Sequence, residues 1–264
     1  MRLLNKVVIV TGSTMGIGKA IARRCILEGG RVVLHGLEEE KGLELVHELG
    51  AASSCFCGGD LLEEKTALTL VEKALKHFGY LDAVVNNAAW VASSDIQTTD
   101  LPFFEKMLRI NTLAPYLLIR HALDALQKRR GSILNIGSVN AYSGEPNLLA
   151  YSVSKGALMT LTRNLGDTLH RQYGVRVNQL NPGWVLTARE QERKVAQGLE
   201  SEWYRNLPNV FAPAGRLLHP EEIAAAAVFW IGDECGPVSG QVVDLEQYPF
   251  AGRNPPKDAT TLSS

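Results

Sequence analysis

The sequence lacks several features that would assign a protein to a special class. Its 27 basic and 28 acidic residues leave a formal net charge of −1, so charge gives no reason to expect nucleic acid or an anionic membrane as partner. No apolar run approaches the ~20 residues that span a bilayer. The N-terminus runs directly into a strand-like segment instead of a signal-peptide core. We therefore expect a cytoplasmic protein that binds neither nucleic acid nor membrane.

Cysteine and histidine are also sparse. The four cysteines are too few and too scattered for a disulfide framework. Cys55 and Cys57 alternate with Phe56, which suits a buried strand face better than a metal site. The six histidines show no spacing typical of metal ligands. The sequence thus predicts a reduced protein that requires no metal ion.

The chain alternates short β-branched runs with longer helical patterns. Strand-like runs lie at residues 7–10, 31–35, 53–57, 83–85, 132–136, 176–180 and 241–245, and helical patterns at residues 17–28, 38–49, 63–78, 103–128, 150–172 and 220–231. Repeated strand–helix–strand units imply right-handed crossovers and a parallel sheet covered on both faces. We predict an α/β fold, a doubly wound, Rossmann-type sheet of seven parallel strands in a three-layer α/β/α arrangement.

The length suits one large α/β domain. We assign residues 1–248 to a single dinucleotide-binding and catalytic domain. Residues 249–264 contain several prolines, which favour an extended C-terminal tail over a helix.

A doubly wound sheet binds its ligand beyond the carboxyl ends of its strands. The first loop there, residues 11–18 (Thr-Gly-Ser-Thr-Met-Gly-Ile-Gly), is rich in glycine and opens a helix. Glycines let the backbone approach a pyrophosphate while the N–H groups of the helix face its charge. The spacing differs from the standard dinucleotide fingerprint, and a glycine-rich turn alone is weak evidence.

Tyr151 and Lys155 are four residues apart on a predicted helix and therefore share a face. A phenol is a poor acid–base catalyst at neutral pH because its pKa is about 10, but a nearby cation favours the phenolate. The pair can then exchange a proton with an alcohol or carbonyl. Ser138, just after a strand, carries a hydroxyl that can bind the same substrate oxygen. In isolation, a Tyr-x-x-x-Lys pattern is more often a surface pair.

Together these segments resemble the classical short-chain dehydrogenase/reductase family over residues 6–244. The glycine loop has the family's Thr-Gly-x-x-x-Gly-x-Gly spacing. Residues 86–89 (Asn-Asn-Ala-Ala) are similar to its Asn-Asn-Ala-Gly segment. Residues 181–183 (Asn-Pro-Gly) and Thr187 are similar to the segment that supports the nicotinamide. The chain departs from the family at residues 245–248, where two glycines are common.

The resemblance implies an NAD(P)-dependent oxidoreductase that interconverts a secondary alcohol and a carbonyl. Tyr151 would transfer the proton, and Lys155 would lower the pKa of Tyr151 and bind the nicotinamide ribose. Ser138 would polarise the carbonyl, and Asn111 would anchor a water of the proton relay. The cofactor-binding residues that the resemblance implies are Gly12, Thr14, Met15, Gly16, Ile17, Gly18, His35, Gly36, Leu37, Asp60, Leu61, Asn87, Ala88, Tyr151, Lys155, Pro182, Gly183, Val185 and Thr187. It also implies a homo-oligomer, a tetramer or dimer formed through the long helices.

The choice between NAD and NADP stays open. Gly36 stands where the family often carries Asp, which pairs with the ribose hydroxyls, and Leu37 stands where NADP users frequently carry Arg. Met15, where many NADP users have a basic residue, is also neutral. His35 either touches a phosphate or faces solvent at the end of its strand.

For the substrate, the family pattern points to Trp90, Asn140, Tyr142 and Trp184. Tryptophans with polar neighbours suit a sugar or polyol, although Trp184 and Trp203 can instead only pack against the protein. The family pattern also places the insertion of roughly residues 189–211 along the pocket. It carries seven charged residues between Arg189 and Glu202, which indicates a solvated, movable helix and not the wall of a steroid site.

Two other functions stay open. A 3-oxoacyl thioester reductase would need a basic patch for an acidic carrier protein, and Arg129-Arg130 is the only obvious cluster. A non-catalytic protein that senses nicotinamide nucleotides typically loses the tyrosine or the lysine, whereas this chain has both.

Overall fold

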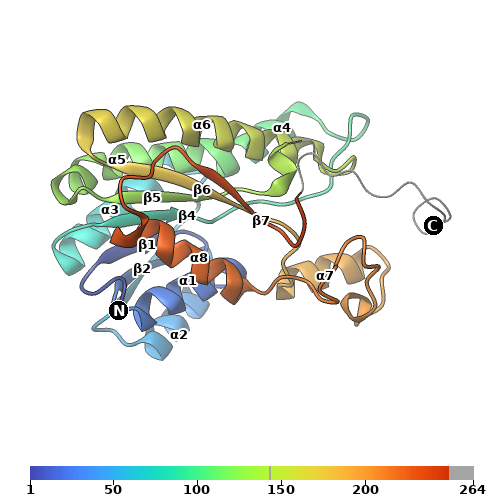
Figure 1. The fold of residues 1–264 in the computed structure, drawn as a ribbon, viewed down its shortest axis with the longest axis horizontal. Helices are drawn as coiled ribbons and strands as arrows, with labels where there is room; N and C mark the ends of the chain where they lie inside the picture. Colours follow the sequence, from blue (N-terminus) through green and yellow to red (C-terminus); the bar gives the residue numbers. More distant parts are fainter. Residues whose placement is uncertain (143, 250–264) are drawn as a thin grey trace.

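The computed structural model describes residues 1–142 and 144–249 and contains a parallel sheet of seven strands in the order β3-β2-β1-β4-β5-β6-β7 (Figure 1). The strands are β1 (Val7–Val10), β2 (Arg31–Gly36), β3 (Ser54–Gly58), β4 (Ala83–Asn86), β5 (Ser132–Ile136), β6 (Arg176–Pro182) and β7 (Val242–Leu245). The order reverses between β1 and β4, which is the switch point where such sheets bind ligands. The predicted fold is confirmed. Nearly all of the predicted tail, residues 250–264, lies outside the described residues.

Helices cover both faces of the sheet (Figure 1). One face carries α1 (Gly16–Leu27), α2 (Glu39–Leu49) and α8 (Pro220–Ile231), and the other carries α3 (Glu64–Phe78), α5 (Ala114–Arg129) and α6 (Leu149–Tyr173). Two shorter helices, α4 (Leu101–Leu108) and α7 (Ala188–Ala196), lie toward the carboxyl ends of the strands. Among the described residues, no helix combines the length and apolarity needed to cross a bilayer.

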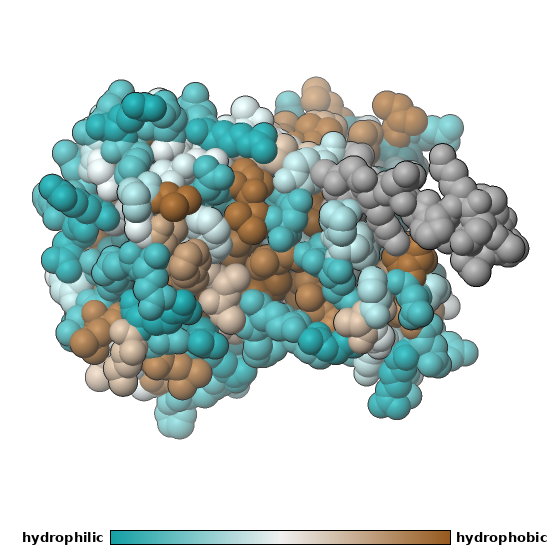
Figure 2. Space-filling view, in the orientation of Figure 1, coloured by the Kyte–Doolittle hydropathy of each residue, from teal (hydrophilic) through white to brown (hydrophobic). Residues whose placement is uncertain are grey.

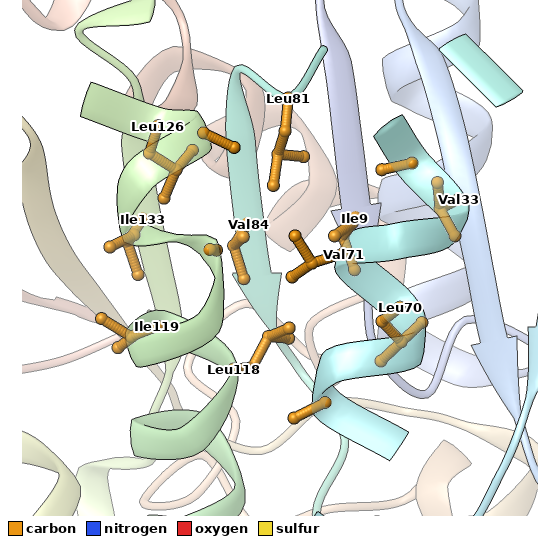
Figure 3. Packing of buried hydrophobic residues seen from close by; sticks show 14 of the residues in the cluster. Ile9, Val33, Leu70, Val71, Leu81, Val84, Leu118, Ile119, Leu126 and Ile133 are labelled. Atoms are coloured by element: carbon orange, nitrogen blue, oxygen red, sulfur yellow. The ribbon is translucent and has the colours of Figure 1, made fainter. Parts of the chain in front are cut away.

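Alternation along the strands divides the core into two clusters. Val7 and Ile9 pack with α3 and α5, whereas Val8 and Val10 pack with α1 and α8, and all four are fully buried. Successive side chains of a strand point to opposite faces, so a strand between two helical layers is apolar at every position. Figure 3 shows the first cluster between α3, α5 and the sheet.

All four cysteines are buried free thiols. Cys55 and Cys57 belong to the cluster beneath α3, which confirms the interpretation of their alternation with Phe56. Burial raises the pKa of the Cys25 thiol to about 12, so this sulfur stays protonated. These residues are core side chains.

The helix predicted at residues 103–128 is in fact interrupted. The structure has α4, a turn of π-helix at Arg109–Leu113, and then α5. Pro115, in the first turn of α5, has no N–H to donate to the Asn111 carbonyl, so the regular bond between these two residues cannot form. Single π-turns are frequent at functional sites. This one carries Asn111.

Candidate active site

The glycine-rich loop joins β1 to α1. Gly12 (φ +62°) and Gly16 (φ +53°) have left-handed backbones that favour glycine. Gly18 packs so tightly that an added Cβ would lie 2.2 Å from the Gly12 oxygen. The loop therefore cannot carry side chains at these three positions.

The N-terminus of α1 opens from this loop. Met15 is the N-cap of α1, and its side chain makes no hydrogen bond to the first turn. The Met15 side chain therefore does not occupy the free N–H groups there. The Asn87 side chain donates to the backbone oxygens of Thr11 (2.9 Å) and Gly12 (3.1 Å), which fixes the loop against the end of β4. A closely packed glycine turn leading into an uncapped helix fits a pyrophosphate.

His35 differs from both sequence interpretations. It is 3% exposed, so it does not face solvent. Its Nδ1 accepts a hydrogen bond from the Gly12 N–H (3.2 Å), and its Nε2 lies 3.0 Å from the Gly59 oxygen, which places the ring proton on Nε2. Burial lowers the pKa of His35 to about 4, so the ring is neutral. With both nitrogens engaged, His35 supports the glycine loop and offers no cation to a phosphate.

Gly36 and Leu37 follow His35 at the end of β2. A Cβ on Gly36 would lie 2.6 Å from the Thr14 methyl, so Thr14 fills the space that an acidic side chain would need. Leu37 is 73% exposed. Neither residue therefore places a charged side chain at the end of β2.

Asp60 and Leu61 follow β3. The Asp60 carboxylate accepts from the Leu62 N–H (2.9 Å), and its backbone oxygen accepts from the Thr66 hydroxyl (2.7 Å). Leu61 is buried in the core cluster beneath α3, so any contact with an adenine would have to use its backbone.

Tyr151 and Lys155 lie together on the first turns of α6. The Lys155 ammonium is 5.7 Å from the centre of the Tyr151 ring and donates to the backbone oxygen of Ile136 at 2.8 Å. Both residues are buried, 9% and 2% exposed. The helix thus places a phenol and an ammonium beside the carboxyl end of β5.

Burial dominates the acid–base properties of both groups. It raises the pKa of Tyr151 to about 12, opposed by a hydrogen bond with the Ser138 hydroxyl and by the charge of Arg193. Glu145 and Glu190 raise this pKa further. Burial also lowers the pKa of Lys155 to about 8. The cation that opposes the rise in the pKa of Tyr151 is Arg193, whereas the family resemblance implies Lys155 for this effect.

Ser138 and Asn140 belong to the turn after β5. The Ser138 N–H donates to the Asn181 side chain (3.2 Å), and its hydroxyl accepts from the Asn140 N–H (3.2 Å). Tyr142, also on this turn, donates its hydroxyl to Asp244 on β7 at 3.0 Å. Ser138, which interacts with the Tyr151 phenol, is thus held by Asn181 and Asn140, whereas the Tyr142 hydroxyl is engaged at the edge of the sheet.

The Asn111 side chain is fully buried and hydrogen-bonded. Its amide joins both backbone groups of Trp90, accepting from the N–H (2.8 Å) and donating to the oxygen (2.9 Å), and also donates to Ser154 (3.0 Å). The side-chain amide of Asn111 is therefore engaged by protein groups. Trp90 packs on Phe103 (4.7 Å) beside the cluster that contains Tyr151.

The turn after β6 carries Gly183 and Trp184 and follows Pro182, the last residue of the strand. The Glu246 carboxylate lies over it and accepts from the N–H of Trp184 (3.1 Å) and of Gln247 (2.8 Å). A Cβ on Gly183 would lie 1.8 Å from this carboxylate. Glu246, in the segment where the chain departs from the family pattern, therefore holds the turn.

The α7 segment, residues 188–211, follows this turn. Thr187 caps α7 by accepting from the Glu190 N–H (3.1 Å), and its methyl group lies 3.5 Å from the position of a Cβ on Gly16. Val185, buried beside it, forms a bridge with Leu218. In Figure 2 the surface of this region, at the lower right, is mostly hydrophilic.

The Trp184 ring is enclosed by the α7 segment. It stacks on Trp203 (5.2 Å between ring centres, 20° between planes), meets Phe211 edge-on (6.4 Å), and has the Lys194 ammonium 5.2 Å from its centre. Its indole N–H donates to Glu190 at 2.9 Å. These contacts favour the packing interpretation of Trp184 over stacking on a sugar ring.

Comparison with known proteins decides the family. The sequence model described as Enoyl-(Acyl carrier protein) reductase matches residues 12–246. This chain belongs to the short-chain dehydrogenase/reductase family. It is 38% identical over 230 residues to the L-fucose dehydrogenase of Mus musculus, covering 86% of this chain and 82% of that protein. It is 31% identical over 240 residues to the 3-beta-hydroxysteroid dehydrogenase of Comamonas testosteroni, covering 90% and 93%.

An uncharacterized oxidoreductase of Thermotoga maritima is 34% identical over 236 residues, covering 88% of this chain and 90% of that protein. Membership makes the protein an oxidoreductase that acts on CH–OH groups with a nicotinamide cofactor. The glycine turn and the uncapped start of α1 fit such a cofactor.

Sequence reasoning missed three residues of this short-chain dehydrogenase/reductase. Glu190 and Arg193 were included only as members of the charged insertion along the pocket, with no role given to either, and Glu246 only as part of a departure from the family. Their i,i+3 spacing was a usable signal for Glu190 and Arg193, because residues three apart on a helix are neighbours. No local signal could have placed Glu246 over Gly183, 63 residues earlier.

Proposed function

We propose that this oxidoreductase interconverts a secondary alcohol and a carbonyl on a sugar, polyol or similar polar substrate, with Tyr151 as its acid–base residue. The observation that carries the proposal is the buried Tyr151–Lys155 pair, 5.7 Å from ring centre to ammonium, beside the polar α7 segment. The similarity to L-fucose dehydrogenase supports a sugar-like substrate.

In this proposal Tyr151 exchanges a proton between its phenol oxygen and the reacting oxygen of the substrate. Ser138, which already interacts with the phenol, binds the same oxygen and polarises the carbonyl. Lys155 keeps a positive charge near the phenol and so favours the phenolate whenever Tyr151 must accept a proton. Asn111 holds the π-turn in position through its bonds to Trp90.

The cofactor would lie along residues 12–18 with its pyrophosphate at the start of α1, and residues 182–187 would support its nicotinamide. When bound, it supplies or accepts the hydride. Thr187, whose methyl group lies beside Gly16, would contact the cofactor from the side of α7. No charged side chain at Gly36 or Leu37 selects between NAD and NADP, so we propose that both are accepted.

We also propose a cytoplasmic homo-oligomer, a dimer or tetramer. Four buried free thiols suit a reducing compartment. Tyr116 on α5 (40% exposed) and Val153 on α6 (44% exposed) supply apolar surface on the long helices. Light scattering would measure the assembly, and Tyr116→Lys should reduce it to smaller species if α5 is the interface.

A substrate panel tests the function. Purified protein is mixed with NAD or NADP and with hexoses, polyols and secondary alcohols, or with a reduced cofactor and ketones or 3-oxoacyl thioesters, and absorbance of the reduced nicotinamide is followed. We expect turnover of sugars or polyols. Activity confined to 3-oxoacyl thioesters would favour the reductase alternative, and nucleotide binding without any turnover would favour a sensor.

A further inference from the structure

The α7 segment brings an ion pair toward Tyr151. Arg193 donates to Glu190 through two atoms, Nε to Oε2 (2.9 Å) and Nη2 to Oε1 (2.8 Å), and the side chains are 24% and 14% exposed. A two-point bond between planar groups fixes their orientation. Glu190 is also bonded by the Trp184 indole, so the pair is anchored to the turn after β6.

The pair lies on α7, which follows the turn after β6 at the carboxyl edge of the sheet, and the Trp184 indole of that turn bonds to Glu190 at 2.9 Å. The charge of Arg193 lowers the pKa of Tyr151, and the charge of Glu190 raises it. Glu145, which lies 3.5 Å from the Asn140 amide, acts on both Tyr151 and Arg193. The pair therefore belongs to the surroundings of Tyr151, unlike Arg189 and Glu192 of the same helix, which are exposed.

The surroundings of Tyr151 hold balanced charges. Lys155 and Arg193 are basic, and Glu145 and Glu190 are acidic. A site with balanced donors and acceptors suits a neutral substrate with several hydroxyl groups, because each hydroxyl both donates and accepts. It does not suit an anion, which would disturb the balance.

Arg193 retains hydrogen-bonding capacity. Its Nε and Nη2 are used by Glu190, and its Nη1 has no partner among residues 1–142 and 144–249. The Trp184 ring is covered by Trp203 and Lys194 and is not free to stack on a substrate. A substrate on this side of the site would therefore be bound by polar groups.

We propose that Arg193, oriented by Glu190, is a specificity residue that binds a hydroxyl group of the substrate other than the one on the reacting carbon. This inference rests on the proposed function, and it names the chemistry of recognition: a neutral polyhydroxylated substrate held by a guanidinium on α7. Glu190 positions Arg193 and ties it to Trp184.

The test compares substrates that differ by one hydroxyl. Wild type, Arg193→Met and Glu190→Gln are assayed with an accepted hexose, with each of its monodeoxy analogues, and with cyclohexanol, which has only the reacting hydroxyl. Arg193→Met should lower kcat/KM for the hexose about 10- to 100-fold, the loss expected for a hydrogen bond with one charged partner. Because the Arg193 charge also acts on Tyr151, the variant should slow all substrates by a common factor. Beyond that common factor, cyclohexanol and one particular deoxy analogue should show no loss.

Glu190→Gln should give a smaller loss with the same pattern, because Gln can still accept from Trp184. Arg189→Met, on the exposed face of α7, is the matched control. Equal losses on all substrates would mean that Arg193 acts only by holding the segment in place or through its charge near Tyr151, and would overturn the proposal. An unchanged hexose rate would also overturn it. If wild type oxidises cyclohexanol but no sugar or polyol, the proposed function fails, an outcome distinct from the variant results.

Discussion

The Lys155 ammonium lies 5.7 Å from the centre of the Tyr151 ring and bonds to the backbone oxygen of Ile136 rather than to the phenol. The lysine is thus fixed to the end of β5, with its ammonium near the Tyr151 ring but not bonded to it. Interaction with the Ser138 hydroxyl lowers the pKa of the phenol. This arrangement leaves the phenol oxygen able to meet a substrate oxygen while a positive charge stays nearby.

Replacing Tyr151 with Phe should remove the group that transfers the proton and keep the aromatic ring in place. We expect kcat to fall about 10²- to 10⁴-fold, the usual contribution of a positioned acid or base. Binding of the nucleotide, followed by fluorescence titration, should be unchanged. Tyr80→Phe is the control, since its hydroxyl bonds to the Asn5 backbone. A Tyr151→Phe variant with near wild-type kcat would end the acid–base assignment.

The pKa shifts predict different pH profiles for the two directions of reaction. With the pKa of Tyr151 raised to about 12, the phenol stays protonated near neutrality, and the phenolate fraction grows about tenfold per pH unit. Alcohol oxidation, which needs the phenolate, should therefore accelerate as pH rises, and carbonyl reduction, which needs the phenol, should not.

Lys155 adds a break to this profile. Because its pKa is lowered to about 8, it loses its charge as pH rises through that value, and the oxidation rate should rise less steeply above it. Initial rates in both directions from pH 6 to 10 would measure this. Lys155→Met should remove the break, and an oxidation rate independent of pH would contradict the assignment of Tyr151.

Leu37 should control cofactor choice. The wild-type protein is expected to bind NADH and NADPH with affinities within about tenfold of each other, because no charged side chain stands at Gly36 or Leu37. Leu37→Arg should strengthen NADPH binding by about tenfold, the effect of one charged hydrogen bond. Fluorescence titration of both nucleotides measures this, with Leu37→Gln as the uncharged control. A wild-type gap far above tenfold would show that another group selects the cofactor.

His35 should make stability depend on pH. Its pKa is about 4 in the folded protein against 6.5 as the ordinary value, so the unfolded chain binds the proton more readily. The stability that comes from the neutral ring is present above pH 6.5 and is lost as pH falls toward 4, by about 3 kcal/mol in total. Urea unfolding at several pH values measures it. His35→Gln should flatten this part of the profile, and His47→Asn, on an exposed residue, should leave it unchanged.

Gly183 and Glu246 should behave as one unit. Gly183→Ala would displace the carboxylate and break its bonds to the Trp184 and Gln247 N–H groups, and Glu246→Ala would remove the same bonds. Each is expected to cost about 1–3 kcal/mol, the penalty for donors left unpaired. The double variant should cost little more than either single variant. Additive losses in the unfolding free energy would contradict the contact.

Much of the sheet could be read from local patterns. The first strand, Val7–Val10, is apolar on both faces, and the other strands carry short β-branched runs. The glycine loop and the Tyr-x-x-x-Lys spacing mark two of the segments that meet at the carboxyl edge of the sheet. The interruption at Arg109–Leu113 was missed because helical periodicity continues through it, and its cause, the missing N–H of Pro115, acts on only one hydrogen bond.

The sequence by itself determined the fold and the pairing of Tyr151 with Lys155, because strand alternation and the spacing of residues on a helix are local properties. Only the tertiary structure decided that His35 turns inward to the glycine loop, that Trp203 covers Trp184, and that Arg193 comes near Tyr151. Each of these depends on the packing of segments distant in the chain, where burial and competing partners set a side chain's direction and charge.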